Sequence, residues 1–349
     1  MLIYNGAEIL DRKFINLIDF LQEGDVLVFN DVRVIKAKMS AQVIGNNVNK
    51  AIENDVKNGH KNIENNDENI VKKNIEFNLD QEISKNTWRV ILRGAKKIKD
   101  GDLLKIAPDF FARITKKLED GFALLEFAED DYREKLDKYG VVPLPPYIKR
   151  AVEDKNIAEK DQKNYQTIYA KEGAAVAAPT AGLHFTDKIF SLLDAKKIKK
   201  VFVTLNVGAG TFLPVRSERL QDHNMHEESF SISKESAEII NETKRRGGRV
   251  VAVGTTSLRV LESIADDEGN LREAKTKTKI FIYPPYKFKV VDILVTNFHL
   301  PKSTLFMLVC AFVGKEKAKE IYDHAISQNY RFYSYGDASL LMKPSAMLR

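Results

Sequence analysis

The sequence predicts an α/β protein of two domains, an α/β sheet domain interrupted by an inserted small antiparallel β-barrel domain. After residue 150, segments with helical periodicity alternate with short apolar runs, which is typical of a sheet covered by helices. Between residues 88 and 127, short strand-like runs follow one another with only glycine or proline turns between them, as in a small barrel. Because one further strand precedes these runs, we assign residues 1–37 and 151–349 to the sheet domain and residues 38–150 to the insertion.

The amino-terminal third is expected to supply the first sheet strand and the barrel. Segment 25–30, DVLVFN, has the alternation of a strand, and segment 32–39, VRVIKAKM, continues as extended chain. Residues 45–86 are rich in Asn, Lys and Glu and poor in aromatic residues, so we expect a mobile loop there. The remaining barrel strands are expected at 88–93, 102–106, 111–117 and 122–127.

A proline-rich connector is expected to end the insertion. Segment 143–150, PLPPYIKR, carries three prolines and cannot continue a central strand, so the domain boundary falls there. The elements expected after it are helices at 187–197, 234–245, 257–265 and 303–312, and strands at 200–205, 249–253, 279–283 and 292–296.

Composition excludes several classes of protein. With 349 residues and 44% hydrophobic content, the chain can bury a large core. Cys310 is the only cysteine, which excludes an internal disulfide and a multi-cysteine metal site and fits a cytoplasmic protein. The most apolar run, residues 305–313, is too short to span a bilayer, and the amino terminus lacks the pattern of a signal peptide, so we expect no membrane role.

The charge balance is mildly basic. The 55 Lys and Arg residues exceed the 49 Asp and Glu residues and give a formal net charge of +6, which favours a polyanionic partner. Part of the excess lies in a cluster formed by Lys196, Lys197, Lys199 and Lys200. Such a cluster is either a solvated helix end or a contact for RNA, and both interpretations stay open at this point.

Residues 176–228 combine small residues with groups that move protons, which is the composition that an active site needs. Gly182, Gly208 and Gly210 allow the backbone to approach a ligand closely. The candidate acid and base groups of this region are His184, Asp222, His223, His226 and Glu228. Since HNMHEE is not the HExxH pattern, a base supported by a carboxylate fits better than a metal site, and we expect no metal.

Two strand ends of the sheet domain carry further candidates. The helix expected after the strand at 249–253 begins near Thr255, Thr256 and Ser257, and its start is either a simple cap or a site for a carboxylate. Asn297 and His299 follow the strand at 292–296, where polar groups suit a crevice site in an open sheet. Taken singly, His299 is equally compatible with a structural histidine.

In its motifs, the chain resembles the S-adenosylmethionine:tRNA ribosyltransferase-isomerase family of queuosine biosynthesis. The matching blocks run in order along nearly the whole chain: LVFNDVRVI (27–35), PLPPYI (143–148), YQTIYA (165–170), VAAPTAGLHF (176–185), VTLNVGAGTFLPV (203–215), HNMHEE (223–228), VAVGTTSLRVLES (251–263), IFIYPPYKFKVVDILVTNFHLPKSTL (280–305) and YRFYSYGDA (330–338). The fold of that family, an α/β domain interrupted by a β-barrel, agrees with the division made above.

The resemblance implies a reaction and its partners. Members of the family transfer the ribosyl part of S-adenosylmethionine to the aminomethyl group of a 7-deazaguanine at the tRNA wobble position and isomerise it, which gives epoxyqueuosine and releases adenine and methionine. S-adenosylmethionine is a substrate here, so no cofactor is expected, and the second partner is the tRNA anticodon arm. We further expect a cytoplasmic monomer.

That chemistry requires a base at the C5′ hydrogens next to the sulfonium and an acid for the departing adenine. We assign the base to His226 supported by Glu228, and the acid to His184 or Asp222, with His223 as a further candidate. For substrate binding we expect the methionine carboxylate at residues 255–257, ribose or adenine at Asn297 and His299, and tRNA phosphates at the lysine cluster and Arg216.

Two departures from the family pattern keep alternatives open. Asn206 stands where the family commonly has histidine, so a proton-transfer role does not carry over to that position. Family members usually begin with a further upstream segment, so the alternative is a truncated, catalytically impaired tRNA-binding relative of the enzyme. A nucleotide-dependent α/β enzyme of another class, such as a dehydrogenase, is disfavoured by the absence of a GxGxxG turn.

Overall fold

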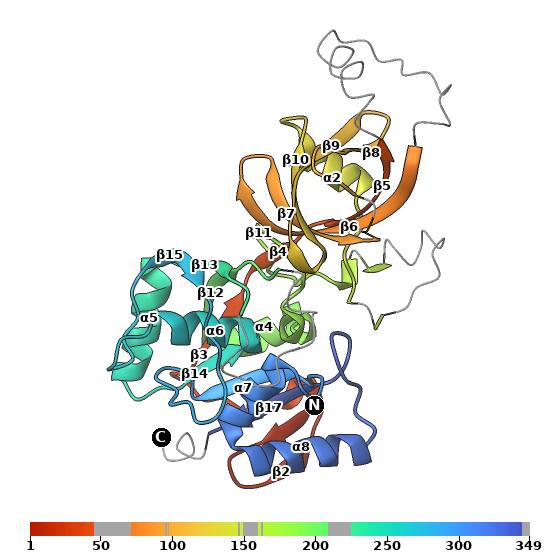
Figure 1. The fold of residues 1–349 in the computed structure, drawn as a ribbon. Helices are drawn as coiled ribbons and strands as arrows, with labels where there is room; N and C mark the ends of the chain where they lie inside the picture. Colours follow the sequence, from red (N-terminus) through yellow and green to blue (C-terminus); the bar gives the residue numbers. More distant parts are fainter. Residues whose placement is uncertain are drawn as a thin grey trace. The chain divides into compact units, whose positions relative to one another are not determined.

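The computed structural model describes residues 1–44, 71–94, 96, 98–145, 147–148, 160–161, 163–208 and 225–343. The chain divides into two compact units (Figure 1). The first unit comprises Met1–Val34, Lys163–Val207 and Phe212–Arg349, and the second comprises Ile35–Gln162 and Gly208–Thr211. A mixed α/β fold with an inserted antiparallel barrel, as expected from the sequence, is confirmed.

The first unit is built on a sheet that has nine strands within the described residues, in the order β15-β13-β12-β3-β14-β16-β17-β1-β2. Four neighbouring strands at its centre run parallel: β12 (Lys199–Leu205), β3 (Val26–Asn30), β14 (Val250–Val253) and β16 (Ile293–Asn297). Every residue of β3, β14 and β16 is buried, as expected for strands covered on both faces. The flanking strands are β13 (Glu228–Ile232), β15 (Ala274–Thr278), β17 (Ala338–Met342), β1 (Leu2–Tyr4) and β2 (Ile9–Asp11).

The direction of the strands brings many polar residues to one edge of this sheet. The carboxyl ends of β12, β3, β14 and β16 meet there because these strands are parallel. Since β13 is antiparallel to β12, and β17 to β16, the first residues of β13 and β17 lie at the same edge. We call this the carboxyl edge.

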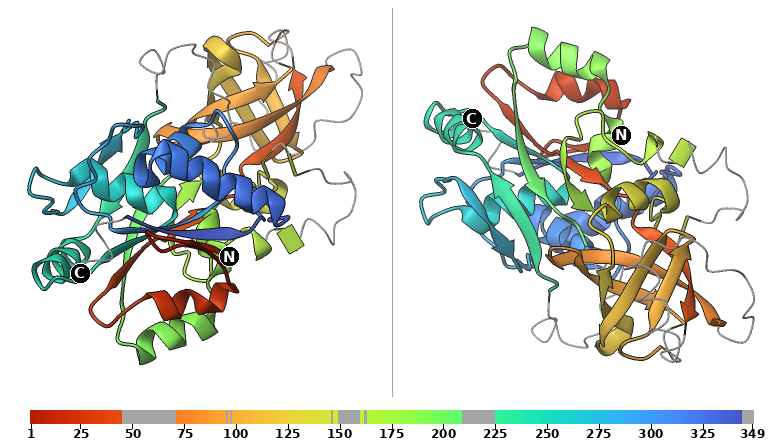
Figure 2. Two further views of the ribbon diagram at one scale, coloured as in Figure 1. Left: turned by 90° about the horizontal axis from the view of Figure 1, so that it is seen from below. Right: turned by 90° about the horizontal axis from the view of Figure 1, so that it is seen from above.

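Helices cover both faces of the sheet and close two apolar cores. One face packs against four helices: α5 (Lys234–Arg245), α6 (Gly254–Ile264), α7 (Thr304–Val313) and α8 (Lys315–Ser327). The other packs against α4 (Asp187–Ala195) and the short helices η1 (Phe14–Phe20) and η5 (Thr180–His184). In the left panel of Figure 2, the blue helices and the red and green helices accordingly lie on opposite sides of the sheet. A small parallel pair, β4 (Val32–Val34) and β11 (Glu172–Ala175), completes the unit.

The second unit is a closed barrel with the strand order β10-β7-β6-β5-β8-β9 within the described residues. Its strands are β5 (Lys38–Ile44), β6 (Val71–Ser84), β7 (Thr87–Arg93), β8 (Leu103–Ala107), β9 (Phe110–Lys117) and β10 (Phe122–Phe127), and the 3-10 turn η4 (Glu119–Gly121) joins the last two. Helix α2 (Tyr132–Tyr139) follows, and the ring of its Tyr132 stacks on Phe127 at 4.9 Å. Trp88, Phe77 and Phe110 are fully buried and fill the barrel.

Two predicted elements are wrong. The expected mobile loop at 45–86 contains the long strand β6, because Ile75, Phe77 and Leu79 alternate into the barrel although the surrounding composition is polar; residues 45–70 lie outside the described residues. The strand expected at 279–283 is instead β15, which precedes it. β15 is an edge strand with the polar sequence AKTKT, so it carries no apolar pattern that would identify it.

The expected start of α6 also needs correction. The helix begins at Gly254, whose φ of +88° is one that glycine adopts readily, and its cap residue is Val253, which makes no side-chain cap hydrogen bond. Ser257 does not cap the helix, because its hydroxyl donates to the carbonyl of Val253 at 2.9 Å. The first turn of α6 is therefore free of a side-chain cap.

Candidate active site

The carboxyl edge collects most of the described candidate residues in one row. In strand order, the row runs from Glu228 at the start of β13, through Asn206 and Asp31 after β12 and β3, to Thr256 after β14 and Asn297 at the end of β16. Neighbouring strands lie about 4.8 Å apart, so the four steps from Glu228 to Asn297 span roughly 19 Å. Ligands of open α/β sheets bind at this kind of edge.

His184 and Asn297 meet at one end of the row. The Asn297 amide nitrogen lies 3.4 Å from His184 Nε2, and because an amide nitrogen can only donate, Nε2 accepts. The same nitrogen lies 3.2 Å from the Tyr333 carbonyl oxygen, while the Asn297 carbonyl oxygen accepts from the Thr180 hydroxyl at 2.9 Å. The hydrogen-bonding groups of Asn297 thus have partners within the protein, so its amide orients the His184 ring rather than a ligand.

The surroundings of His184 favour its neutral form. Its ring stacks on Phe14, with the ring centroids 5.0 Å apart and the planes at 26°. Burial lowers the pKa of His184, and the nearby negative charge of Asp337 only partly opposes this effect. A neutral imidazole whose position is fixed by stacking and by an amide is suited to accept a proton near neutral pH.

His299 lies in a different environment from the one expected of a ligand-binding residue. Its Nε2 lies 2.9 Å from the Thr296 hydroxyl, and its backbone N–H donates to the Tyr322 hydroxyl at 3.0 Å. Burial lowers the pKa of His299 to about 4, so the ring is neutral at pH 7. These contacts describe a structural histidine that joins the end of β16 to α8.

Three buried hydroxyl groups near the middle of the row have no hydrogen-bond partner among the described residues. They belong to Thr167, Tyr169 and Thr256, which we call the hydroxyl cluster. Two of these residues lie against Gly182. A Cβ added at Gly182 would lie 2.0 Å from the Tyr169 hydroxyl oxygen and 3.0 Å from Thr167 Cγ2.

The third member of the cluster lies on the other side of η5. A Cβ added at Gly254 would lie 3.3 Å from the Thr256 hydroxyl oxygen and 3.9 Å from the Cβ of Ala181, which precedes Gly182. A buried hydroxyl without a partner costs about 1–3 kcal/mol. Three of them around one short helix are the arrangement expected where a polar ligand supplies the missing partners.

Glu228 and Arg259 form a buried ion pair at the opposite end of the row. Both side chains are about 94% buried, and Arg259 Nη1 donates to the Glu228 carboxylate. Arg259 lies one helical turn after Thr255 on α6, and its Nε is buried without a partner within the described residues. The carboxylate of Glu228 is therefore engaged by a cation, and His226, two residues earlier, is exposed.

Four candidates cannot be placed, and a fifth belongs to the second unit. Asp222, His223, Gly210 and Arg216 lie outside the described residues. Gly208 belongs to the second unit, where an added Cβ would lie 2.7 Å from Asp80 Oδ1. Among the described residues, no group of three His, Cys, Asp or Glu side chains is arranged to hold a metal ion.

The lysine cluster is engaged by the protein itself. Lys196 donates to the carbonyls of Ile18 and Leu21 at 2.7 and 2.6 Å, and Lys197 pairs with Glu23 at 3.3 Å. Lys200 pairs with Asp194. These contacts lie where α4 ends and β12 begins, at the edge opposite the carboxyl edge, which favours the solvated-helix-end interpretation.

Sequence reasoning missed Thr180, Thr167, Tyr169 and Arg259. The first three lie in the matching blocks YQTIYA and VAAPTAGLHF, but the blocks did not single out these side chains, and only the fold brings them to His184, Gly182 and Asn297. Arg259 did carry one, since it is a charged residue within the buried helix pattern SLRVLES. A buried arginine of this kind calls for a carboxylate partner.

Comparisons with known proteins show the family of this chain. A model of the queuosine biosynthesis protein family matches residues 1–341. The chain belongs to that family. Relatives named S-adenosylmethionine:tRNA ribosyltransferase-isomerase include proteins of Allorhizobium ampelinum, 46% identical over 95% of this chain and 88% of the relative, and of Acidiphilium cryptum, 44% identical over 98% of this chain and 91% of the relative.

A solved structure is also similar. The S-adenosylmethionine tRNA ribosyltransferase of Thermotoga maritima is 31% identical and matches 98% of this chain and 91% of its own, with a TM-score of 0.49. Family membership confirms the resemblance drawn from the sequence motifs. None of the helices in the described part of the chain is long and apolar enough to cross a membrane.

Proposed function

We propose that this protein is the S-adenosylmethionine:tRNA ribosyltransferase-isomerase of queuosine biosynthesis, which transfers and isomerises the ribosyl group of S-adenosylmethionine onto the aminomethyl-deazaguanine of tRNA. The observation that carries the proposal is the match of the family to residues 1–341, together with relatives of that name at about 45% identity over nearly the whole chain. Because the match is this extensive, the catalytically impaired relative is not favoured. We expect the enzyme to act in the cytoplasm as a monomer.

We place the donor at the carboxyl edge, over the hydroxyl cluster and the start of α6. Ribose hydroxyls both donate and accept, so they are suitable partners for the buried hydroxyls of Thr167, Tyr169 and Thr256. The methionine carboxylate fits the first turn of α6, where N–H groups lack a side-chain cap and the helix dipole favours an anion.

We assign the base at the C5′ hydrogens to His184, in place of His226. Burial lowers the pKa of His184 and keeps its ring neutral, which favours a base over an acid. Asn297 positions the ring through a long 3.4 Å contact to Nε2, and we propose that this contact breaks when Nε2 takes the C5′ proton. Glu228 cannot support His226 freely, because Arg259 already holds its carboxylate. This change makes His226, which we expected to be the base, a new candidate for the acid that protonates adenine, although the two histidines lie near opposite ends of the row.

A direct assay tests the reaction. Purified protein is incubated with S-adenosylmethionine and tRNA that carries the aminomethyl-deazaguanine, adenine is measured by chromatography, and the digested nucleosides are analysed by mass spectrometry. Epoxyqueuosine with an equal amount of adenine supports the proposal, whereas tRNA binding without either product contradicts it.

Single substitutions in the same assay separate the two histidines. We expect His184→Ala to lower kcat by a factor of about 100 or more, the usual contribution of a positioned base. His324→Ala is the matched control, because His324 lies on α8 and contacts Asp11 of β2 at 3.0 Å, three strands away from β16 in the sheet order. If His184→Ala turns over like this control while His226→Ala is inactive, the base assignment returns to His226.

A further inference from the structure

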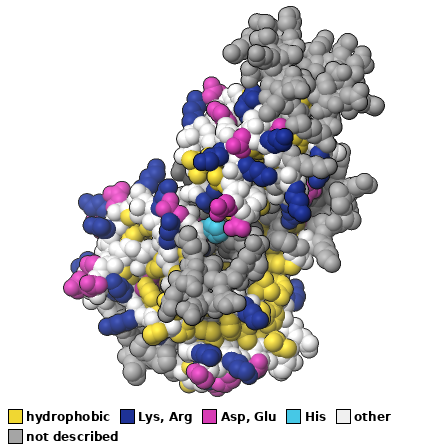
Figure 3. Space-filling model, in the orientation of Figure 1, with side chains coloured by type: hydrophobic (Ala, Val, Ile, Leu, Met, Phe, Trp, Pro, Cys, Tyr) yellow, Lys and Arg dark blue, Asp and Glu magenta, His cyan; other side chains and the backbone are white. Residues whose placement is uncertain are grey.

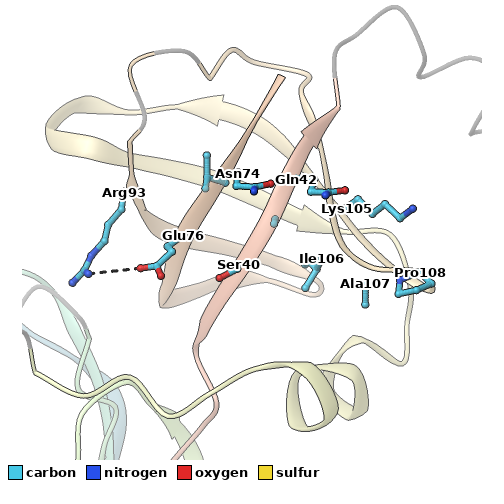
Figure 4. Close-up of a pocket in the computed structure, with 11 residues that line it drawn as sticks. Ser40, Gln42, Asn74, Glu76, Arg93, Lys105, Ile106, Ala107 and Pro108 are labelled. Carbon is cyan, nitrogen blue, oxygen red and sulfur yellow. Dashed lines mark ion pairs between the residues drawn. The ribbon is translucent and has the colours of Figure 1, made fainter. Parts of the chain in front are cut away.

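The outer wall of the barrel carries a groove that the proposed reaction does not use (Figure 4). Its volume is about 720 Å³, and it lies within the second unit. The polar side chains that line it come from four strands: Ser40, Gln42, Asn74, Glu76, Arg93 and Lys105. We call it the barrel groove.

Strand register arranges these side chains in two rows. Gln42 of β5 is opposite both Lys105 of β8 and Asn74 of β6, which forms the first row. Glu76 of β6 is opposite both Ser40 of β5 and Arg93 of β7, which forms the second. Because alternate residues of a strand face opposite sides, the residues between them, Ala41 and Ile75, are buried in the barrel.

The amide and hydroxyl groups of the groove are unused by the protein. Within the described part of the chain, the side chains of Ser40, Gln42 and Asn74 have no hydrogen-bond partner. Gln42 and Asn74 lie next to each other in Figure 4, with Lys105 beside them. A row of free donors and acceptors on a barrel wall is solvated unless a polar ligand replaces the water.

The charge of the groove is positive. Glu76 forms ion pairs with Lys38 at 3.2 Å and with Arg93 at 3.7 Å. Lys105 makes no ion pair with any described residue. Among the residues that line the groove, two cations, Arg93 and Lys105, and one anion, Glu76, leave an excess of one positive charge. On the face drawn in Figure 3, Lys and Arg side chains are spread among acidic ones. The lysine cluster is engaged by the protein itself.

We propose that the barrel groove binds the sugar–phosphate backbone of the tRNA substrate. The inference rests on the proposed function for the identity of the RNA. Lysine and arginine bind phosphate oxygens, while amides and hydroxyls, which donate and accept, match the ribose 2′-hydroxyl that distinguishes RNA from DNA. A protein partner is disfavoured, because none of the described residues that line the groove has an aromatic side chain, the kind that most often anchors a protein interface.

Charge reversal tests the proposal. In Lys105→Glu we expect the Kd for tRNA to rise about tenfold and the slope of log Kd against log salt to fall by about one, as for loss of one phosphate contact. The KM for S-adenosylmethionine and the kcat at saturating tRNA stay at the wild-type values. Lys116→Glu is the matched control, since Lys116 is an exposed barrel lysine on β9 that does not line the groove.

A second variant isolates the neutral contacts. The double substitution Gln42→Ala with Asn74→Ala weakens tRNA binding about fivefold and leaves the salt slope unchanged, because it removes no charge. If Lys105→Glu and Lys116→Glu bind tRNA with equal affinity, the barrel groove is not a tRNA site. Normal activity of the wild-type protein would still support the proposed function. If the wild-type protein forms no product but binds tRNA, and Lys105→Glu weakens that binding, the proposed reaction is refuted instead.

Discussion

Replacing Tyr169 by phenylalanine separates a ligand-binding hydroxyl from a structural one. The ring of Tyr169 packs against Phe29 at 5.0 Å and stacks on Phe190 at 5.7 Å, and phenylalanine keeps both contacts. Burial, helped by the negative charge of Asp31, raises the pKa of the phenol, so the hydroxyl is neutral at every working pH. The substitution therefore removes one uncharged hydroxyl and nothing else.

Tyr169→Phe is expected to preserve or raise the stability of the free protein and to weaken the binding of S-adenosylmethionine. In the free protein the hydroxyl is buried without a partner, so its removal leaves the free energy of unfolding unchanged or raises it by about 1 kcal/mol. In the complex it removes one hydrogen bond to the donor, worth about 0.5–1.5 kcal/mol, so the Kd for S-adenosylmethionine rises about 2- to 13-fold. Urea unfolding measures the first quantity and titration calorimetry the second.

Tyr322→Phe is the control for this experiment, because it makes the same chemical change at a hydroxyl with a known partner. The Tyr322 hydroxyl accepts from the His299 backbone N–H, so its loss lowers the free energy of unfolding by about 1–3 kcal/mol without changing donor affinity. If Tyr169→Phe behaves like Tyr322→Phe, with lower stability and an unchanged Kd, the hydroxyl cluster is not the donor site.

Two further predictions concern stability. Asp25 and Arg249 form a buried bidentate ion pair at 2.6 and 3.0 Å, so Asp25→Asn leaves the guanidinium uncompensated and lowers the free energy of unfolding by about 3–5 kcal/mol in urea titrations; a change below about 1 kcal/mol would contradict the burial of the pair. The pKa of His299 is about 4 in the folded protein and about 6.5 when unfolded, so the unfolded state binds the extra proton and about 3 kcal/mol of stability is lost as pH falls from 7 to 4. The loss should be smaller in His299→Gln, and an equal pH dependence in both proteins would show that another group is responsible.

Elements with an uninterrupted hydrophobic period were predictable from the sequence. Helix α5 and strand β10 have the bounds that their periodicities predict, because a buried face of a helix or strand leaves its spacing in the sequence. β15 lacks a buried face over most of its length, and in β6 the alternation of Ile75, Phe77 and Leu79 was concealed by the polar composition around it. Pairing with other strands forms both: β13 pairs with β15, and β5 and β7 pair with β6.

The candidate site was predictable as a set of residues but not as an arrangement. His184 and Asn297 are 113 positions apart, and the chain gives no sign that they meet; the alignment of η5 with the end of β16 brings them together. Glu228 follows His226 closely in sequence and was expected to support it, yet the fold turns its carboxylate to Arg259 on α6. Spacing in the sequence therefore predicted support of His226 by Glu228, which the fold does not favour, and gave no indication of the contact between His184 and Asn297.

The position of Asn297 explains why the base depends on residues far from the chemistry. Its amide joins three segments: the end of β16, where Asn297 lies, η5 at Thr180 and His184, and the turn that carries the carbonyls of Tyr333 and Gly336. A shift of any of these segments moves the imidazole while leaving the core strands in place. Because a reacting imidazole must lie within hydrogen-bond reach of its proton, the base role that we propose for His184 depends on its position as well as on its pKa.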